Sequence, residues 1–367
     1  GSVVFASNLH GPDDTLDPLL GTSTIDYTRV NTGFNGLIQI WTDMSLHGEL
    51  AEEWSVNSNA TEYIFKIRKG VKFHNGASFS ADDVVKTYNH VSAKDSGVLT
   101  KRNVSWIDRA EKVDADTVRV YLKKTFPAAL EYVSGPMAIF PKDIWATARK
   151  NAKGKPDYGT VAPIGTGPYK TTKVVAGESV SMEKNADYWK GSPKGSPSIG
   201  KIMFRTISDP EAQIAELLSG SIDWIWDVPK DKAEQLKLIG TNKVMNVPTM
   251  RISYITMDRA GRSGKGKENP FFNKKVRQAV AHSIDRNAIA KELVGGASQV
   301  IHSACFPTQF GCTQDVPQYA YDPAKSKKLL AEAGYPNGFS TEIMAYRQRE
   351  YTEAVMGYLA KVGIKSN

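Results

Sequence analysis

The sequence has few of the features that would assign it a membrane location or a metal centre. Only two of its 367 residues are cysteine and six are histidine. The histidines stand apart from one another, so none of them forms a pair at metal-ligand spacing, and we expect no metal site. No apolar run approaches the ~20 residues that a membrane-spanning helix needs. The chain is therefore expected to be a water-soluble globular protein.

Motifs of nucleotide-binding and hydrolytic enzymes are also missing. The sequence contains no G-x-x-x-x-G-K-[ST] loop, no G-x-S-x-G elbow and no H-E-x-x-H helix. The segment IGTGPYK holds Gly165 and Gly167, but a proline follows and the third glycine of a dinucleotide-binding loop is absent. A catalytic triad drawn from distant segments would leave no local pattern. We nevertheless expect a protein that is not an enzyme and that uses no cofactor.

The net charge of +8 raises the question of a nucleic-acid partner. The basic residues are scattered except in the stretch 261–278, which is expected to be a solvated loop running into an exposed helix face. A nucleic-acid groove would interleave aromatic side chains with the charges for base stacking. Only Phe271 and Phe272 are available there, and they are expected to anchor the loop to a core. We therefore predict no nucleic-acid partner.

The two cysteines lie close together in the segment SACFPTQFGCTQD. Pro307 and Gly311 would allow the chain to turn back, so that Cys305 and Cys312 could form a disulfide. Such a bond would stabilise the fold by about 2–3 kcal/mol in the chain-entropy model. The alternative is a pair of free buried thiols. A disulfide would indicate an oxidising compartment, either the periplasm or the cell exterior.

Helices and strands mix without a regular alternation, which favours an α/β protein with mixed sheets. A chain of this length is expected to form two or three domains. Asp209 and Asp322 each precede a proline and an apolar stripe, and Gly220 and Gly334 follow, so helices are predicted from about 210 and 323. Further helices are expected from about 273 and from 285 to 295. Predicted strands include TVRVYLK, SVSMEKN, KIMFRTI, DWIWDV, RISYITMD and FSTEIMAY.

The stretch 63–91 combines a strand, a turn and a helix. Tyr63, Phe65 and Ile67 alternate with polar or outward positions, which is the period of a half-buried strand. Ser80 followed three residues later by Asp83 predicts a capping box at the start of a helix. Seven tryptophans, fifteen tyrosines and thirteen phenylalanines are too many for cores alone. They predict an aromatic-lined cleft for a small molecule.

The residues of this region resemble the family 5 extracytoplasmic solute-binding proteins, the dipeptide-, oligopeptide- and nickel-binding components of ABC importers. That family carries P-x-L-A-x-S-W, F-x-L-R-x-G-V-x-F-x-x-G and A-D-D-V in this order. Gly48 stands where the family has proline. The matching residues are Leu50, Ala51, Trp54, Phe65, Arg68, Gly70, Val71, Phe73, Gly76 and Ala81 to Val84. Further stretches resemble the family in order: DTLDPLL, MAIFPKDIW, PIGTGPYK, NADYWKGSPK, GSIDWIWDVP, NKKVRQAVAHSIDRNAIAKELVGG and YDPAKSKKLLAEAGYPNGF.

The resemblance implies a two-lobed periplasmic-binding-protein (type II) fold with an extra subdomain on lobe I. Mapped onto this chain, lobe I comprises 1–30 and 164–248, the extra subdomain 31–163, and lobe II 249–367. Family chains usually run to about 500 residues. We therefore expect either a truncated chain or a missing C-terminal part of lobe II.

The resemblance also suggests where a ligand would bind. A guanidinium can hold a ligand carboxylate through two parallel hydrogen bonds. Arg347 and Arg349 are both candidates, with Arg347 preferred, and Arg347→Ala should weaken binding at least tenfold in calorimetry. The remaining predicted ligand contacts are Trp226, Trp224, Trp106, Phe34 and Asn35. The arginine of nickel-binding members would fall near Met137 or Ala138 and is not matched, which argues against nickel.

The predicted function is therefore that of a monomeric substrate-binding component of an ABC importer. It would capture a peptide, an opine or a similar small solute between two lobes and deliver it unaltered to an inner-membrane permease. The expected location is the periplasm or the outer face of the membrane, after export by a signal peptide that this chain does not contain. The alternatives are a peptidase- or amidase-like enzyme and a ligand sensor on the same fold.

Overall fold

A computed structural model describes residues 1–7, 24–134, 137–150, 154, 156–158, 163–175, 177–247, 249–262, 269–296, 298–345 and 349–367. These residues pack into two units, Gly1–Val228 (unit 1) and Pro229–Asn367 (unit 2). Within the described residues, no helix combines the length and the apolar composition that crossing a bilayer requires.

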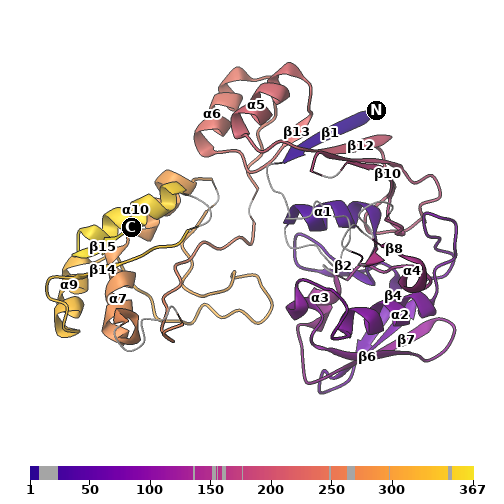
Figure 1. Ribbon diagram of the computed structural model, residues 1–367, viewed down its shortest axis with the longest axis horizontal. Helices are drawn as coiled ribbons and strands as arrows, with labels where there is room; N and C mark the ends of the chain where they lie inside the picture. The colour runs from indigo at the N-terminus through magenta and orange to yellow at the C-terminus, as the bar shows by residue number, and fades with distance from the viewer. Residues whose placement is uncertain are drawn as a thin grey trace. The chain divides into compact units, whose positions relative to one another are not determined.

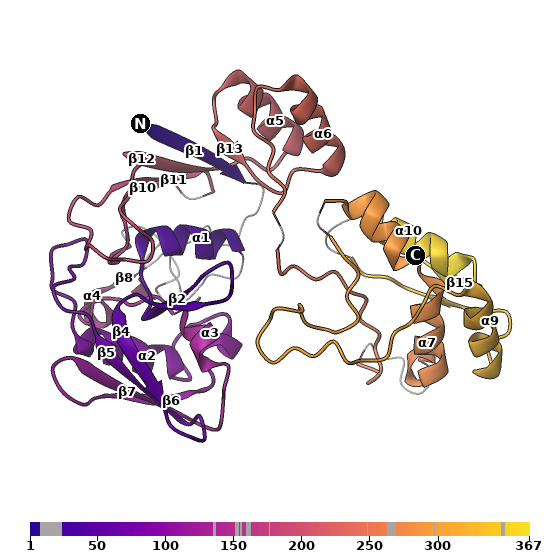
Figure 2. The ribbon, with the colours of Figure 1, turned by 180° about the vertical axis from the view of Figure 1, so that it is seen from behind.

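The first sheet of unit 1 is a mixed, five-stranded sheet with the order β10-β11-β12-β1-β13 (Figure 1). Strand β1 runs parallel to β12 and β13, whereas β11 is antiparallel to both of its neighbours, β10 and β12. Helices α1 and α5 lie on opposite faces of this sheet in Figures 1 and 2. The bounds are β1 (Ser2–Ser7), α1 (Thr24–Gly33), β10 (Tyr169–Val175), β11 (Ser179–Lys184), β12 (Lys201–Thr206), α5 (Pro210–Ser219) and β13 (Trp224–Ile225).

The second sheet of unit 1 is antiparallel, with the order β4-β5-β7-β6, and helix α2 packs against it. Tyr63, Phe65 and Ile67 of β5 are buried while the residues between them are more exposed, so the predicted period of two is confirmed. The backbone N–H and the hydroxyl of Ser80 both donate to Asp83 Oδ2, which confirms the predicted capping box. The bounds are β4 (Ala51–Val56), β5 (Glu62–Ile67), α2 (Ala81–Ser92), β6 (Ile107–Lys112) and β7 (Thr117–Leu122).

The large core of unit 1 lies between this antiparallel sheet, α2 and several short elements. Among its fully buried side chains are Phe34, Leu37, Ile38, Leu50, Phe65, Tyr88, Ile107, Ile139 and Phe140. The short elements are β2 (Ile38–Ile40), β3 (Leu46–Gly48), η1 (Lys101–Asn103), α3 (Ala129–Ser134), α4 (Ile144–Thr147), β8 (Arg149–Lys150) and β9 (Pro156–Asp157). This region lies within the segment predicted to be the extra subdomain.

The regular secondary structure in the described part of unit 2 is mainly helical. Helix α7 packs against α9, and Val276, Ala279, Leu330, Leu359 and Ile364 are buried in the shared core. The bounds are α6 (Lys230–Ile239), η3 (Pro270–Phe272), α7 (Lys274–Ser283), α8 (Arg286–Ala288), η4 (Ile289–Val294, a π-helix), α9 (Pro323–Glu332), β14 (Phe339–Thr341), α10 (Arg349–Ala360) and β15 (Ile364–Ser366). Strands β14 and β15 form a parallel pair.

The predicted helix boundaries are confirmed. Asp209 and Asp322 each accept a hydrogen bond from a backbone N–H in the first turn of α5 and α9. Gly220 ends α5 with a left-handed φ of 76°, a conformation that glycine adopts without steric cost.

The predicted strand RISYITMD is wrong. Residues 251–258 form no strand, and Tyr254 is 78% exposed. No described strand pairs with this backbone. Ladder hydrogen bonds, which define a strand, therefore cannot form.

The predicted disulfide is confirmed. Cys305 and Cys312 are joined, with their Cα atoms 5.8 Å apart, within the usual range for a disulfide. Both residues are partly exposed, in a segment of unit 2 without helix or strand. The alternative of two free buried thiols is therefore wrong.

Candidate ligand-binding site

A pocket of about 240 Å³ opens at the carboxyl end of the parallel strands of unit 1. In open α/β sheets, ligands bind outside the carboxyl ends of parallel strands. The lining residues come from β1, β12 and β13, from the residue just after β13 and from one side of α1. They are Phe5, Ala6, Ser7, Thr28, Thr32, Ile202, Phe204, Arg205, Trp224 and Trp226.

Strand register determines which aromatic rings meet in this pocket. Phe5 is paired with Phe204 of β12 on one side and with Trp224 of β13 on the other. Residues paired across parallel neighbours point to the same face of a sheet, so the three rings form a row. The centroid of Phe5 lies 5.4 Å from that of Phe204 and 5.2 Å from that of Trp224. Trp226 extends the row, with its ring centroid 6.4 Å from that of Trp224.

Trp224 and Trp226 differ in exposure. Trp224 is 42% exposed, whereas Trp226 is half-buried. The indole N–H of Trp226 is buried and has no hydrogen-bond partner within the described part of the chain. Asp227, which follows it, has a left-handed φ of 60°. Strained backbone and unpaired buried donors both cost free energy and concentrate at functional sites.

The charged group in the pocket wall already has a partner. The Arg205 guanidinium binds Glu216 of α5 through two hydrogen bonds, of which the one from Nη2 to Oε1 is 3.3 Å long. The hydroxyl of Thr32 donates to the Thr28 carbonyl within α1 at 2.8 Å. The pocket therefore presents mainly ring and methyl surface to an incoming molecule.

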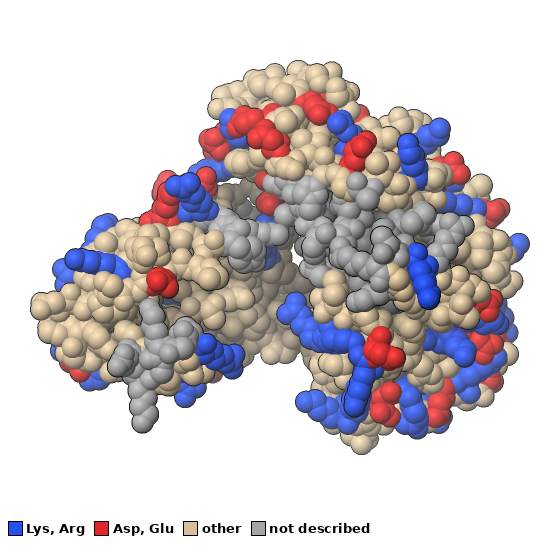
Figure 3. All heavy atoms as spheres, in the orientation of Figure 1, with Lys and Arg blue, Asp and Glu red and all other residues tan. Residues whose placement is uncertain are grey.

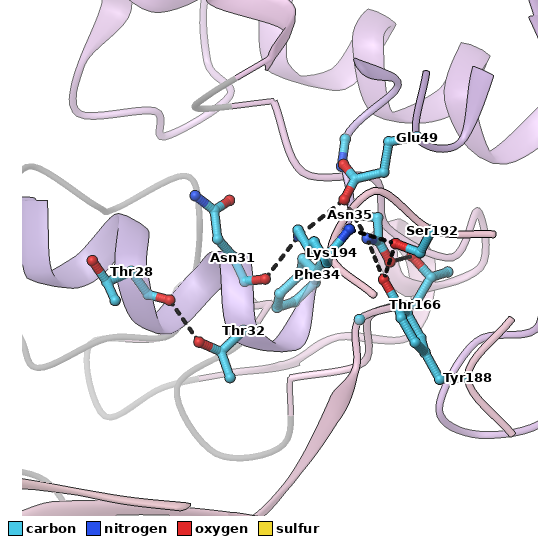
Figure 4. Close-up of polar contacts among 12 residues, drawn as sticks. Thr28, Asn31, Thr32, Phe34, Asn35, Glu49, Thr166, Tyr188, Ser192 and Lys194 are labelled. Carbon is cyan, nitrogen blue, oxygen red and sulfur yellow. Dashed lines mark hydrogen bonds and ion pairs between the residues drawn. The ribbon is translucent and has the colours of Figure 1, made fainter. Parts of the chain in front are cut away.

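A largely buried lysine, Lys194, holds the C-terminal end of α1, the helix that contributes one wall of the pocket (Figure 4). Lys194 Nζ donates to the carbonyls of Asn31 and Phe34 at 2.8 and 2.7 Å and lies 3.0 Å from Glu49 Oε1. A cation stabilises a helix C-terminus because the last carbonyls have no partner inside the helix. Burial lowers the pKa of Lys194, and the negative charge of Glu49 opposes that effect.

Glu49 connects this lysine to a wider buried network (Figure 4). Its Oε2 accepts from the Gly36 N–H at 2.8 Å and its Oε1 accepts from the Asn35 amide. The Thr166 hydroxyl donates to Asn35 Oδ1 at 3.0 Å, and the Asn35 amide also lies 3.2 Å from the Tyr188 hydroxyl. Burial is the main reason that the pKa of Tyr188 is raised to about 12. The network fixes the chain just after α1.

His74 holds the loop at Gly165 and Gly167, which contacts the end of α1. Its backbone N–H donates to Gly165 O, its Nδ1 accepts from the Gly165 N–H at 3.4 Å, and its Nε2 donates to Gly167 O at 3.0 Å. This arrangement requires a neutral ring with the proton on Nε2. Burial is the main cause that lowers the pKa of His74 to about 4, and the charge of Lys170 acts in the same direction.

His74 should make the stability of unit 1 depend on pH. Its folded pKa lies below the unfolded value of 6.5, so the unfolded chain binds the proton more readily between these values. The stabilisation is complete above pH 6.5 and is lost as the pH falls through 4. We expect His74 to contribute about 2–3 kcal/mol to the free energy of unfolding at pH 7. Burial also lowers the pKa of His90, so His90 changes the free energy of unfolding with pH in the same direction.

Urea unfolding followed by tryptophan fluorescence between pH 4 and 7 measures this effect. All seven tryptophans lie at or before position 226, so the signal reports unit 1 alone. In His74→Gln, the free energy of unfolding should depend much less on pH between 4 and 7. His302→Gln, at an exposed position in unit 2, should keep the pH dependence. An unchanged pH dependence in His74→Gln would show that another group causes it.

The sequence as a whole matches a known family. Residues 45–367 match the family model described as bacterial extracellular solute-binding proteins, family 5 Middle. The chain belongs to this family. The glutathione-binding protein GsiB of Salmonella choleraesuis (strain SC-B67) is 30% identical over 362 residues. The match covers 96% of this chain and 66% of GsiB, so the chain spans slightly less than two thirds of that relative's length.

Solved structures agree with the family assignment. The A. tumefaciens R10 protein MoaA in complex with mannopinic acid matches with a TM-score of 0.80 and 26% identity, covering 100% of this chain and 72% of that one. The Helicobacter pylori protein DppA in complex with the peptide STSA matches with a TM-score of 0.77 and 25% identity, covering 100% and 73%. The predicted α/β, two-lobed periplasmic-binding-protein fold is confirmed.

The ligand contacts predicted from the resemblance to family 5 lie in different surroundings. Trp224 and Trp226 both line the pocket. Phe34 and Asn35 are buried next to the pocket-lining helix, and Asn35 is held by the network described above. Trp106 is 6% exposed in the large core, and its indole N–H donates to Asn103 O at 2.7 Å. As ligand contacts, these residues remain predictions.

The two predicted arginines lie in unit 2. Arg349 is the first residue of α10, its side chain is 90% exposed, and its Nε lies 2.7 Å from Glu353 Oε1. Arg347 lies outside the described residues. The preference for Arg347 over Arg349 therefore remains a prediction.

Three residues that build the site were missed by reasoning from the sequence. Glu49 and Lys194 lie in stretches that resemble the family, LHGELAEEW and SPK, but no local pattern distinguishes them from exposed charges. Arg205 lies in the predicted strand KIMFRTI, where a charged residue after alternating apolar ones was a weak sign of a strand end. Within the described residues, no group of three or more histidine, cysteine or carboxylate side chains could hold a metal ion.

Proposed function

We propose that this chain is the substrate-binding component of an ABC importer and that it captures a peptide or peptide-like small solute. The observation that carries the proposal is the aromatic pocket at the carboxyl edge of β1, β12 and β13, in a chain that belongs to family 5. Proteins similar to this chain are named for binding glutathione, or were solved with the peptide STSA or with mannopinic acid. These ligands are all small amino-acid-derived solutes.

The proposed mechanism is capture without chemistry. A ligand bound to unit 1 would gain further contacts from the rest of the protein only in a closed state, and these added contacts would shift the population toward closure. An inner-membrane permease would then recognise the closed form. In this proposal, residues 1–30 and 164–248 are lobe I, residues 31–163 the extra subdomain, and residues 249–367 belong to lobe II.

Several features support the proposed partners and location. The Cys305–Cys312 disulfide fits an oxidising compartment such as the periplasm. Lys and Arg side chains are interspersed with Asp and Glu over the described part of unit 1 in the view of Figure 3, which fits a solvated surface better than a nucleic-acid groove. The predicted basic stretch 261–278 lies partly outside the described residues. We propose a monomer that delivers its solute unaltered.

Isothermal titration calorimetry of the chain with glutathione, the peptide STSA and mannopinic acid tests this function. Trp226→Ala should weaken binding of whichever solute binds by about tenfold or more, because an aromatic side chain contributes roughly 1.5–3 kcal/mol when its apolar surface is buried. Trp41→Ala removes an exposed ring that does not line the pocket and should leave the affinity unchanged.

Mass spectrometry of the solute after incubation separates binding from catalysis. An unaltered mass supports a transport protein, whereas a hydrolysed peptide would favour the peptidase-like alternative. If none of these three solutes binds, and small peptides with a large apolar side chain such as Ala-Phe do not bind either, the proposed function is wrong.

A further inference from the structure

The volume of the unit 1 pocket limits what it can hold. At about 240 Å³, it is larger than the ~150 Å³ cavity that accepts benzene. It is smaller than the ~300–1,000 Å³ of sites that enclose a drug-sized ligand. The pocket can therefore accept one side-chain-sized group of a solute, while the rest of that solute lies outside it.

Among the described residues that line the pocket, none offers a free charge to such a group. The Arg205 guanidinium is bound to Glu216, and the Thr32 hydroxyl donates within its own helix. A carboxylate or an ammonium group entering the pocket would lose hydration without gaining an ion pair, which is strongly unfavourable. A small group such as a hydrogen or a methyl would leave the apolar walls uncovered.

The aromatic row provides the matching surface for an apolar group. Phe5 is stacked against Phe204 with an interplanar angle of 23°, and Trp224 meets Phe5 edge-on at 63°. A ring or a branched aliphatic chain can pack against these faces and edges, because aromatic side chains favour offset-stacked and edge-to-face contacts. Phe204 and Ile202 are buried in the sheet, so this wall is held in place by the core.

We propose that this pocket is a specificity subsite for one bulky apolar group, aromatic or branched aliphatic, carried by the bound solute. The inference rests on the proposed function and adds a substrate class to it. Glutathione has no such group and mannopinic acid is polar, so neither of these two solutes is the preferred ligand. A small peptide with a large apolar side chain has the required chemistry.

Calorimetry with four dipeptides that share an N-terminal alanine tests the subsite. Ala-Phe and Ala-Leu should bind about 10- to 100-fold more tightly than Ala-Gly and Ala-Glu, because only the first two bury apolar surface in the pocket. If Ala-Gly or Ala-Glu binds as tightly as Ala-Phe, the apolar subsite is refuted while the proposed function stands. If none of the four binds but glutathione or mannopinic acid does, the subsite is refuted as well.

A variant with a filled pocket tests whether the preference for Ala-Phe over Ala-Gly arises in this pocket. Thr28 is an exposed residue of α1 in the pocket wall, and Thr28→Trp should reduce the preference for Ala-Phe over Ala-Gly to less than about threefold. Thr42→Trp makes the same chemical change at an exposed position away from the pocket and should retain the full preference. Full preference in Thr28→Trp would place the selecting surface elsewhere and overturn the inference. Circular dichroism of both variants serves as the control for folding.

Discussion

Replacing Lys194 by methionine is expected to lower the free energy of unfolding of unit 1 by about 3–5 kcal/mol. The methionine keeps the apolar stem, but Glu49 becomes a buried carboxylate without its cation. The side chains of Lys194 and Glu49 are only 13% and 3% exposed, so water cannot replace the lost partner. The carbonyls of Asn31 and Phe34 lose their donor at the same time. Urea unfolding followed by tryptophan fluorescence measures the loss.

Two comparisons make this prediction specific. Lys112→Met removes a lysine whose partner Asp82 is exposed, and it should cost no more than about 1 kcal/mol. The double variant Lys194→Met/Glu49→Gln should be more stable than Lys194→Met, since it leaves no uncompensated charge. If Lys194→Met and Lys112→Met have the same small effect, the buried pair does not hold α1 as described.

Replacing Gly167 by alanine is expected to lower the free energy of unfolding of unit 1 by about 3 kcal/mol or more. An added Cβ would lie 2.6 Å from both Gly33 O and Phe34 N. These are backbone atoms at the end of α1, which cannot rotate away as a side chain would. The Gly167 N–H also donates to Gly33 O at 3.0 Å, so moving the loop breaks a hydrogen bond. Because α1 lines the pocket, the displacement should weaken ligand binding as well.

Gly357 provides the matched control for this substitution. It lies inside α10 of unit 2, and an added Cβ would meet no atom within 4 Å. Gly357→Ala should therefore stabilise unit 2 by about 0.5–1 kcal/mol through helix propensity, measured by circular dichroism at 222 nm during thermal unfolding. A Gly167→Ala variant as stable as the wild type would show that the loop and α1 can separate without cost.

The glycines of IGTGPYK have a packing role that their spacing in the sequence does not reveal. The missing third glycine argued against a dinucleotide-binding loop. What the spacing did not show is that Gly165 and Gly167 both pass directly over Gly33 at the end of α1. That contact joins segments more than a hundred residues apart, and only the folded chain brings them together.

Local patterns were sufficient for features that depend on neighbours in the chain. The capping box at Ser80 and the disulfide between Cys305 and Cys312 each depend on residues within a few positions of one another. The family also followed from short motifs in order. RISYITMD failed because a strand requires a partner backbone, and alternation of side chains says nothing about whether a partner is present.

The sequence by itself therefore determined the capped starts of α5 and α9, several strands, the disulfide and the family of this protein. Tertiary structure alone decided that Lys194 meets Glu49 at the end of α1 and that Arg205 is bound to Glu216. It also decided that Phe5, Phe204, Trp224 and Trp226 form one aromatic wall. The physical reason is that capping and periodicity act over one or two turns, whereas the charge and shape of a pocket depend on side chains that only strand register and packing bring together.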